Sequence, residues 1–255
     1  SDYAAHCTTF VIAGVETLGF EIVMQFREKY GKDTDVVVCT NAGGGNLTGT
    51  ARGLIKAGAE SQIVAASVNL KGLHMASDEQ FNKKSFTTGH TGFGIPFTTW
   101  PDRSDVPRSA ARPMRYMDRY VTVTQGSVFY MTEALASLEG LEKGPAGNTA
   151  LAAAFALAQE MDQDQMILVQ ETEYTGAGKH IQPQLAFAKE NGIEVVFGDP
   201  SDEVPGKNVV LPAHPSMIRV KDSDMAKLRK SLIKNALEMT GKVPTDEDIE
   251  FLAKE

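Results

Sequence analysis

The fold is decided by one stretch of sequence, Val36-Val37-Val38-Cys39-Thr40-Asn41-Ala42-Gly43-Gly44-Gly45-Asn46-Leu47-Thr48-Gly49. An apolar run typical of a buried strand leads into a glycine turn, and a helical pattern over residues 51–57 follows. The first turn of a helix has backbone N–H groups without helical partners and the positive end of the helix dipole, so this geometry suits a phosphate. Three consecutive glycines also remove the Cβ atoms that would hold a phosphate away from the backbone.

Two interpretations of this stretch stay open from the residues alone, because short glycine motifs often recur by chance. One is a phosphate-binding loop, and the other is a tight turn that joins a strand to a helix. The run matches neither GxGxxG nor GxxxxGK[ST], which argues against a dinucleotide fingerprint and against a Walker loop.

The composition is that of a globular protein and argues against several functions. The 255 residues are 42% hydrophobic and 23% charged, enough for one large domain or two small ones. The net charge is -8 and no basic cluster is dense, so we expect no nucleic-acid binding. No run reaches the ~18 apolar residues of a membrane span, and we expect no signal peptide. The two cysteines, Cys7 and Cys39, imply no disulfide framework, so we expect a cytoplasmic protein with Cys39 buried.

Helical and strand-like patterns alternate along the chain, which predicts an α/β fold. We expect strands over residues 36–40, 62–68, 120–123, 166–169 and 193–197, and helices over residues 14–30, 51–57, 127–139, 150–160 and 183–191. Continuous apolar strands between helices predict an open, mostly parallel sheet with helices on both faces. Such sheets bind ligands outside the carboxyl ends of their strands. We therefore expect the loops after Thr40 and Val169 to face one pocket, and the alanine-rich helix over residues 150–160 to pack centrally.

Residues 69–119 break this alternation, since they are rich in glycine and proline and show little periodicity. A loop of this length in a compact domain is usually functional or an insertion. His74 and His90 lie in it, but no third ligand occurs at a useful spacing, so no metal site is predicted.

The tail of the chain reads as two further helices. One is capped by Asp222 or Ser223 and runs to Thr240, and the other starts with an acidic turn after Thr245. We therefore divide the chain into an α/β large domain over residues 1–220 and a C-terminal helical extension over residues 221–255.

Three separated motifs, Asn41–Asn46, Gly144–Ala150 and Thr175–Lys179, occur in a recognisable order. Their order resembles that of the pyridoxal-phosphate (PLP) enzymes of fold type II, a group that includes threonine synthase and cysteine synthase. The resemblance implies the large-domain part of the tryptophan synthase beta-like fold. Within this group, residues 144–180 and the segment His214–Ile218 are most similar to the beta subunits of 2-amino-4-ketopentanoate thiolases.

The resemblance implies PLP as the cofactor and assigns residues to it. Five consecutive residues of the glycine loop would hold the PLP phosphate through their backbone N–H groups: Ala42, Gly43, Gly44, Gly45 and Asn46. Thr175 would face the pyridine nitrogen, and a hydroxyl there leaves that nitrogen largely unprotonated. The chemistry at the substrate carbons belongs to the cofactor, while the protein supplies position and electrostatics.

The likeness to thiolase beta subunits also implies an activity and partners. Such an enzyme cleaves 2-amino-4-ketopentanoate with coenzyme A to alanine and acetyl-CoA, as an acyltransferase of ornithine fermentation. The implied partners are a small alpha subunit, the upstream half of the same enzyme, the amino-acid substrate and coenzyme A, and we expect an oligomer. Two alternatives stay open: a lyase or β-replacement enzyme like cysteine or threonine synthase, and a non-catalytic half-domain that binds a phosphate ligand or a partner.

One departure from the family pattern concerns the Schiff-base lysine, which the resemblance places far upstream of the phosphate loop. Only 40 residues precede the loop here, and their lysines are Lys29 and Lys32. Both fall at the end of an amphipathic helix, where a cation next to the negative end of the helix dipole is ordinary. We therefore expect the C-terminal half of an enzyme, inactive alone, and assign no catalytic residue within it.

Overall fold

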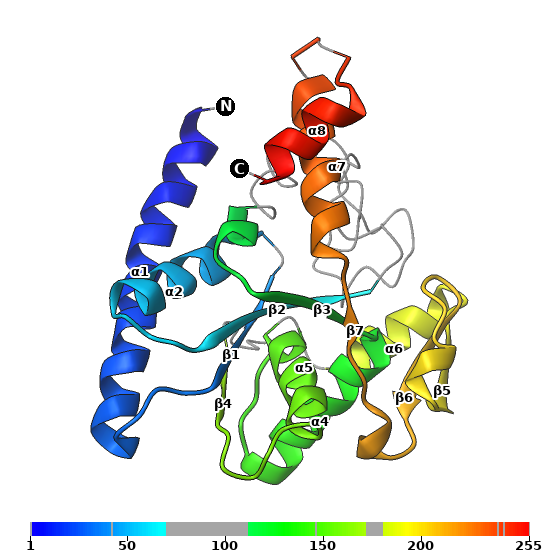
Figure 1. The fold of residues 1–255 in the computed structure, drawn as a ribbon. Helices are drawn as coiled ribbons and strands as arrows, with labels where there is room; N and C mark the ends of the chain where they lie inside the picture. The colour runs from blue at the N-terminus through cyan, green and yellow to red at the C-terminus, as the bar shows by residue number, and fades with distance from the viewer. Residues whose placement is uncertain are drawn as a thin grey trace.

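The computed structural model describes residues 2–41, 43–69, 112–145, 147–171, 181–238, 240–241 and 243–254. Its centre is a five-stranded sheet in the order β4-β1-β2-β3-β7, in which the first four strands are parallel and β7 is antiparallel to β3 (Figure 1). The sheet strands are β1 (Val36–Thr40), β2 (Gln62–Val68), β3 (Arg119–Val123), β4 (Ile167–Gln170) and β7 (Lys221–Asp222). A separate parallel pair consists of β5 (Glu194–Gly198) and β6 (Asn208–Pro212).

Helices cover both faces of this sheet, as Figure 1 shows. The helices are α1 (Asp2–Tyr30), α2 (Gly45–Lys56), α4 (Gln125–Glu139), α5 (Asn148–Ala158), α6 (Ile181–Glu190), α7 (Met225–Glu238) and α8 (Asp246–Lys254). Short 3-10 turns are η3 (Arg112–Arg115), η4 (Pro200–Asp202) and η5 (Pro215–Met217). The predicted α/β fold with an open, mostly parallel sheet is therefore confirmed.

Alternate residues of the central strands enter two different cores, because successive strand side chains point to opposite faces. Val38, Val64 and Val121 join a cluster that includes the buried alanines of α5 and residues of α4. Val37 and Tyr120 join a second cluster with α2, η3 and residues of α1 and α7. The strands therefore read as continuous apolar runs because both faces are buried, and α5 packs centrally as its alanines predict.

A third cluster lies beside the sheet. It joins Phe129 of α4 to Ile181 and Leu185 of α6 and to Val209 of β6. The sequence analysis did not predict β6 or β7, which lie after turns rather than between clear helical patterns.

The tail begins within the main sheet. β7 pairs with β3, and Arg119 and Asp222 form a bidentate ion pair at 2.6 and 2.9 Å. Asp222 is therefore not the cap of α7, and the prediction of Asp222 or Ser223 is wrong. Asp224 accepts from the backbone N–H of Lys227 at 2.9 Å and caps the helix instead. The division at residue 220 stays a prediction.

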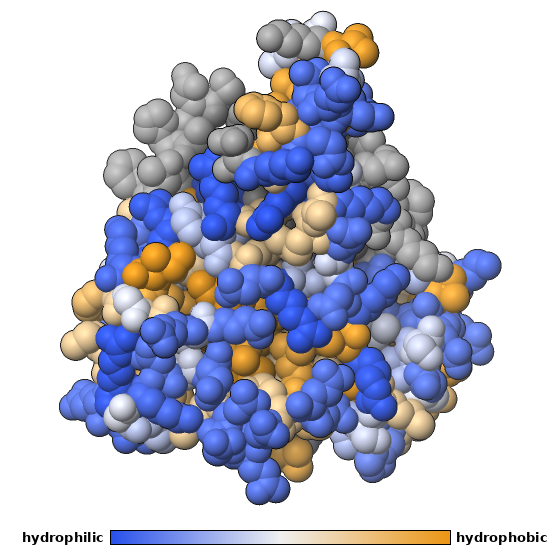
Figure 2. All heavy atoms as spheres, in the orientation of Figure 1, coloured by the Kyte–Doolittle hydropathy of each residue, from blue (hydrophilic) through white to orange (hydrophobic). Residues whose placement is uncertain are grey.

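The surface agrees with this layered core. Polar and charged residues (blue) cover most of the face drawn in Figure 2, and hydrophobic residues (orange) show in smaller areas between them. No helix in the described ranges is both long and apolar enough to span a membrane.

Helices α1 and α2 pack against each other at glycine positions. A Cβ atom added to Gly19 would lie 2.1 Å from the carbonyl oxygen of Thr50, and one added to Gly53 would lie 2.2 Å from that of Glu16. Gly14 lies on α1, as Gly19 does, but no heavy atom lies within 4 Å of a Cβ added to Gly14. Close backbone approach therefore excludes any side chain at Gly19 and Gly53 but not at Gly14.

This packing predicts opposite effects for two identical substitutions on α1. Gly19→Ala should lower the free energy of unfolding by about 1–3 kcal/mol, because the new methyl group overlaps backbone that cannot yield easily. Gly14→Ala should raise it by roughly 0.5–1 kcal/mol, because alanine has the higher helix propensity. Urea unfolding of both variants measures the two changes, and equal shifts would contradict the close-packing account.

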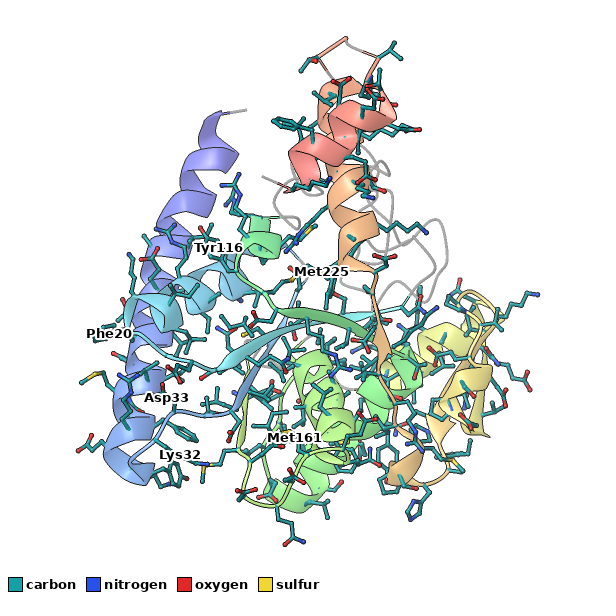
Figure 3. The ribbon with its side chains drawn as sticks, in the orientation of Figure 1. Phe20, Lys32, Asp33, Tyr116, Met161 and Met225 are labelled. Atoms are coloured by element: carbon teal, nitrogen blue, oxygen red, sulfur yellow. The ribbon has the colours of Figure 1, made fainter. Side chains whose placement is uncertain are left out.

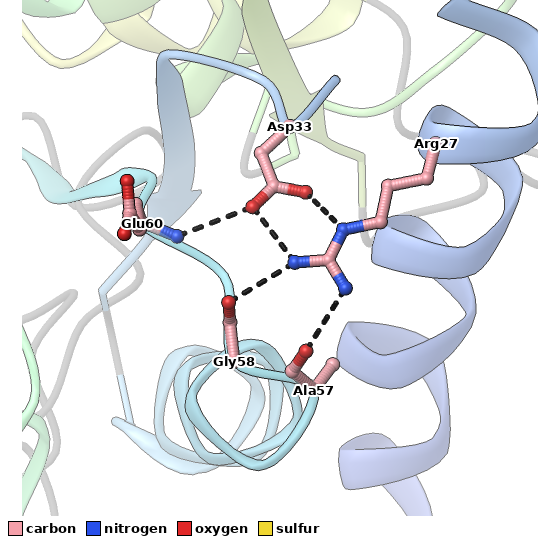
Figure 4. Close-up of polar contacts among 5 residues, drawn as sticks. All are labelled: Arg27, Asp33, Ala57, Gly58 and Glu60. Carbon is pink, nitrogen blue, oxygen red and sulfur yellow. Dashed lines mark hydrogen bonds and ion pairs between the residues drawn. The ribbon is translucent and has the colours of Figure 1, made fainter. Parts of the chain in front are cut away.

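Arg27 ties the end of α1 to the end of α2 (Figure 4). Its guanidinium donates to Asp33 at 2.6 and 2.9 Å and to the carbonyl oxygens of Ala57 and Gly58 at 3.2 and 3.0 Å. The backbone N–H of Glu60 also donates to Asp33, at 3.3 Å. The Arg27 contact lowers the pKa of Asp33, so this carboxylate stays charged at a pH where a solvent-exposed aspartate is partly protonated.

The lowered pKa predicts a pH-dependent contribution to stability. Because the folded pKa of Asp33 lies below its unfolded value, its stabilisation is present above pH ~3.9 and is lost as the pH falls through the folded pKa. Asp33→Asn should therefore lower the thermal midpoint at pH 7, and the difference from the parent should shrink towards pH 3. Calorimetry across this range is the measurement, with Glu28→Gln as a surface control, and a difference independent of pH would refute the assignment.

Candidate functional site

The glycine loop lies at the carboxyl end of β1, where α2 begins. Gly44 is the N-cap residue of α2 and has φ 79°, a left-handed conformation that favours glycine. No side chain of the described residues caps this helix start. The backbone hydrogen bonds of α2 begin at Thr48, whose N–H donates to the carbonyl oxygen of Gly44 at 3.1 Å. The N–H groups of residues 45–47 are therefore those that a helix offers to an anion.

Two other helices, α4 and α5, start at the same edge of the sheet, and the chain itself supplies acceptors to N–H groups of their first turns. At α4, the carboxylate of Glu203 accepts from the N–H groups of Gln125 and Gly126 at 2.6 and 2.7 Å. Its second oxygen also accepts from the N–H of Val210 at 3.1 Å. Burial raises the pKa of Glu203 to about 7, although these three donors oppose the shift. A carboxylate of the protein therefore already occupies the anion position of α4.

At α5, the chain supplies acceptors to two N–H groups of the first turn, those of Asn148 and Ala150. The N–H of Asn148 donates to the carbonyl oxygen of Gly144 at 3.2 Å. The hydroxyl of Thr40 accepts from the N–H of Ala150 at 3.1 Å and donates to the carbonyl oxygen of Gly147 at 3.2 Å. Thr40 thus joins the end of β1 to the start of α5, and α2 is left as the anion site among these three helices.

Three buried polar residues hold the peptide that enters the loop. The N–H of Asn41 donates to the carbonyl oxygen of Ala66 at 2.8 Å. The hydroxyl of Ser67 donates to the carbonyl oxygen of Asn41 and lies 3.0 Å from the hydroxyl of Tyr120. Sequence analysis missed Ser67 and Tyr120, although a serine within an apolar strand is a visible departure from the pattern.

The structure brings together part of the predicted site. Gly43, Gly44, Gly45 and Asn46 lie at the start of α2, which begins six residues earlier than the helix expected over residues 51–57. Gly43 is exposed, and Gly45 and Asn46 are half-buried. Gln170, at the end of the adjacent strand β4, pairs in register with Cys39. Its amide donates to the hydroxyl of Thr50 of α2 at 2.7 Å. The ends of β1 and β4 are therefore neighbours at one edge.

Several predicted residues lie outside the described part of the chain. They are Ala42 and Thr175 of the predicted PLP site, together with His74, His90 and Lys179. Within the described ranges, no group of three or more His, Cys, Asp or Glu residues has the arrangement of a metal site. The assignments of Ala42 and Thr175 stay predictions.

The two lysines that precede the loop lie away from it. Lys29 is in the last turn of α1, and its ammonium lies 5.0 Å from the ring centre of Tyr30. Lys32 follows the helix and donates to the carbonyl oxygen of Asp164 at 3.0 Å. Figure 3 shows Lys32 beyond the end of α1, beside Asp33. This region precedes β1, so both lysines lie towards the amino-terminal edge of the sheet, opposite to the glycine loop.

The geometry fits a phosphate group. The loop offers the N–H groups of the first turn of α2, a helix dipole and no Cβ atom on residues 43–45. Cys39, directly behind it, is fully buried as predicted, and burial raises the pKa of its thiol to about 12, so it stays an uncharged part of the core.

Comparison with known proteins agrees with this geometry. Residues 2–172 match the family described as pyridoxal-phosphate dependent enzymes. The 2-amino-4-ketopentanoate thiolase beta subunit of Acetoanaerobium sticklandii is 76% identical over 249 residues, which cover 97% of this chain and 53% of that protein. A protein of the same name from an unknown prokaryotic organism is 63% identical over 248 residues, covering 96% of this chain and 52% of that protein. The chain therefore spans about half the length of these relatives.

Among solved structures, a threonine deaminase from T.th. resembles this chain, with 18% identity and a TM-score of 0.47. The matched region covers 64% of this chain and 57% of the threonine deaminase chain.

The family match extends from α1 through β4 and includes the whole glycine loop. The chain belongs to the family of pyridoxal-phosphate dependent enzymes.

Proposed function

We propose that the glycine loop holds the phosphate of PLP and that the chain is part of the beta subunit of a 2-amino-4-ketopentanoate thiolase. The first proposal rests on the start of α2. Gly44 is its N-cap residue, and no side chain of the described residues accepts a hydrogen bond from its first turn. The family is PLP-dependent, and a phosphate accepts hydrogen bonds from such N–H groups. In this proposal Ala42 to Asn46 contact the phosphate and Thr175 faces the pyridine nitrogen.

The identity of the two relatives, 76% and 63%, supports the choice of reaction. In the proposed reaction the thiolate of coenzyme A bonds to the ketone carbon of 2-amino-4-ketopentanoate. The bond from that carbon to the adjacent CH2 group breaks, and a proton adds to the released carbon. The products are acetyl-CoA and alanine. Bound PLP withdraws electrons from the carbon atoms next to the amino group.

The residues of this chain would bind and orient. The loop N–H groups fix the phosphate end of the cofactor, and the buried layers beneath them keep water from the underside of the loop. Lys29 and Lys32 are remote from it, so we expect the lysine that bonds to PLP in the part of the protein outside this chain. The proposal also includes a small alpha subunit, an oligomeric assembly, acyltransferase activity in ornithine degradation, and a cytoplasmic location.

The reaction is tested with a full-length chimera in which this chain replaces the matching segment of the Acetoanaerobium sticklandii beta subunit. Purified with the alpha subunit, the chimera should form acetyl-CoA from 2-amino-4-ketopentanoate and coenzyme A at a rate within about tenfold of the parent enzyme, because both segments share 76% of their residues. Formation of cysteine from an activated serine and sulfide, with no acetyl-CoA, would support a β-replacement enzyme instead. A folded chimera with neither activity would support a non-catalytic half-domain.

Phosphate binding is tested by Gly44→Ala in the same chimera. The left-handed conformation costs an L-residue about 1–2 kcal/mol, so the loop should shift and the dissociation constant for PLP should rise about tenfold. Gly58→Ala is the matched control, because Gly58 has φ 66° at the opposite end of α2. Calorimetric titration of the cofactor-free protein measures both affinities. Equal losses of affinity in the two variants would point to general destabilisation and contradict the phosphate assignment.

A further inference from the structure

We propose that Tyr120 and Ser67 are positioning residues that fix the peptide entering the glycine loop and so set the affinity of the loop for phosphate. This inference rests on the proposed function, since it requires that the loop binds phosphate. Neither residue is placed to touch the anion itself, because both act through Asn41.

The three residues come from three neighbouring parts of the sheet. Asn41 directly follows β1, Ser67 is on β2 and Tyr120 is on β3, and the order of the sheet places these strands side by side. Each of the three is only 1% exposed. Buried polar groups are costly unless they are hydrogen-bonded, so this cluster is stable only when its members bond to one another.

The direction of each hydrogen bond follows from the number of protons available. A carbonyl oxygen only accepts, so the single hydroxyl proton of Ser67 goes to the carbonyl oxygen of Asn41. The oxygen of Ser67 then accepts from the hydroxyl of Tyr120, 3.0 Å away. The side chain of Asn41 hydrogen-bonds in turn to the oxygen of Tyr120. The three residues therefore form a closed ring of donors and acceptors.

This ring holds Asn41 at three points. Its carbonyl oxygen is bonded to Ser67, its side chain to Tyr120, and its N–H to the carbonyl oxygen of Ala66 at 2.8 Å. The peptide that follows Asn41 cannot rotate without breaking these bonds. The glycines begin two residues later and have the widest choice of backbone conformation. A fixed starting peptide is therefore what limits the conformations of the loop.

The ring is permanent rather than a pH-dependent switch. Burial raises the pKa of Tyr120 well above its usual value, so its hydroxyl keeps its proton at every ordinary pH. Ser67 and Asn41 do not titrate. Hydrogen bonds in a closed buried network also strengthen one another, so loss of one member should weaken the remaining bonds.

The test uses Tyr120→Phe, Ser67→Ala and the double variant in the full-length chimera. The control is Thr34→Val, which removes a buried hydroxyl at the opposite end of β1. That hydroxyl donates to the carbonyl oxygen of Met166 at 2.9 Å, and Thr34 is 3% exposed. Dissociation constants for PLP and for pyridoxal, which lacks the phosphate, are measured on the cofactor-free protein together with the thermal midpoint.

Each single variant should weaken PLP binding about fivefold to tenfold, the usual effect of one lost hydrogen bond, and leave pyridoxal binding within about twofold. The double variant should lose little more than either single one, because the ring is already open. Thr34→Val should lower the thermal midpoint without changing the ratio of the two affinities.

If Tyr120→Phe and Ser67→Ala behave like Thr34→Val, the positioning role is overturned while phosphate binding by the parent stands. If the parent itself binds PLP no better than pyridoxal, the phosphate assignment fails and the positioning role with it.

Discussion

The burial of β1 on both faces is the constraint on which the rest of the structure depends. Its residues alternate between the cluster covered by α4 and α5 and the cluster covered by α1, α2 and α7. A strand buried in this way needs hydrogen-bonded neighbours on both sides, and β2 and β4 provide them in parallel. Parallel strands end at one edge of the sheet, so the same constraint that forms the core also brings the glycine loop and the end of β4 together.

The contrast between the starts of α2, α4 and α5 explains why we assign the anion to α2 among these three helices. A buried carboxylate from Glu203 satisfies the start of α4, and Thr40 supplies an acceptor to the first turn of α5. Either arrangement would compete with a phosphate for the same N–H groups. The N-cap residue is a glycine at both α2 (Gly44) and α5 (Gly147), but at α2 no side chain of the described residues accepts from the first-turn N–H groups.

Sequence patterns predicted the layers well because they depend on local periodicity. The predicted bounds of β1 and β2 agree with the structure, and α4, α5 and α6 begin within two residues of their expected starts. β7 was missed because its two residues, Lys221 and Asp222, carry no periodicity, and β6 was missed because turns rather than clear helical patterns flank it. The cap of α7 was misplaced because Asp222, a good cap by residue type, bonds instead to Arg119 across the sheet, and a contact between distant residues leaves no local pattern.

The site shows the same limit more sharply. A glycine loop can be recognised from sequence because its requirement is local: backbone N–H groups, a positive φ and no side chains. The residues that hold the loop in place are recruited across the sheet from β2 and β3, 26 and 79 positions after Asn41, as the numbering of Ser67 and Tyr120 shows. Ser67 and Tyr120 become a unit with Asn41 only when the strands pair, because the sheet order, not the chain order, makes them neighbours. The glycine loop can therefore be recognised from a local motif, whereas the hydrogen-bonded residues beside it cannot.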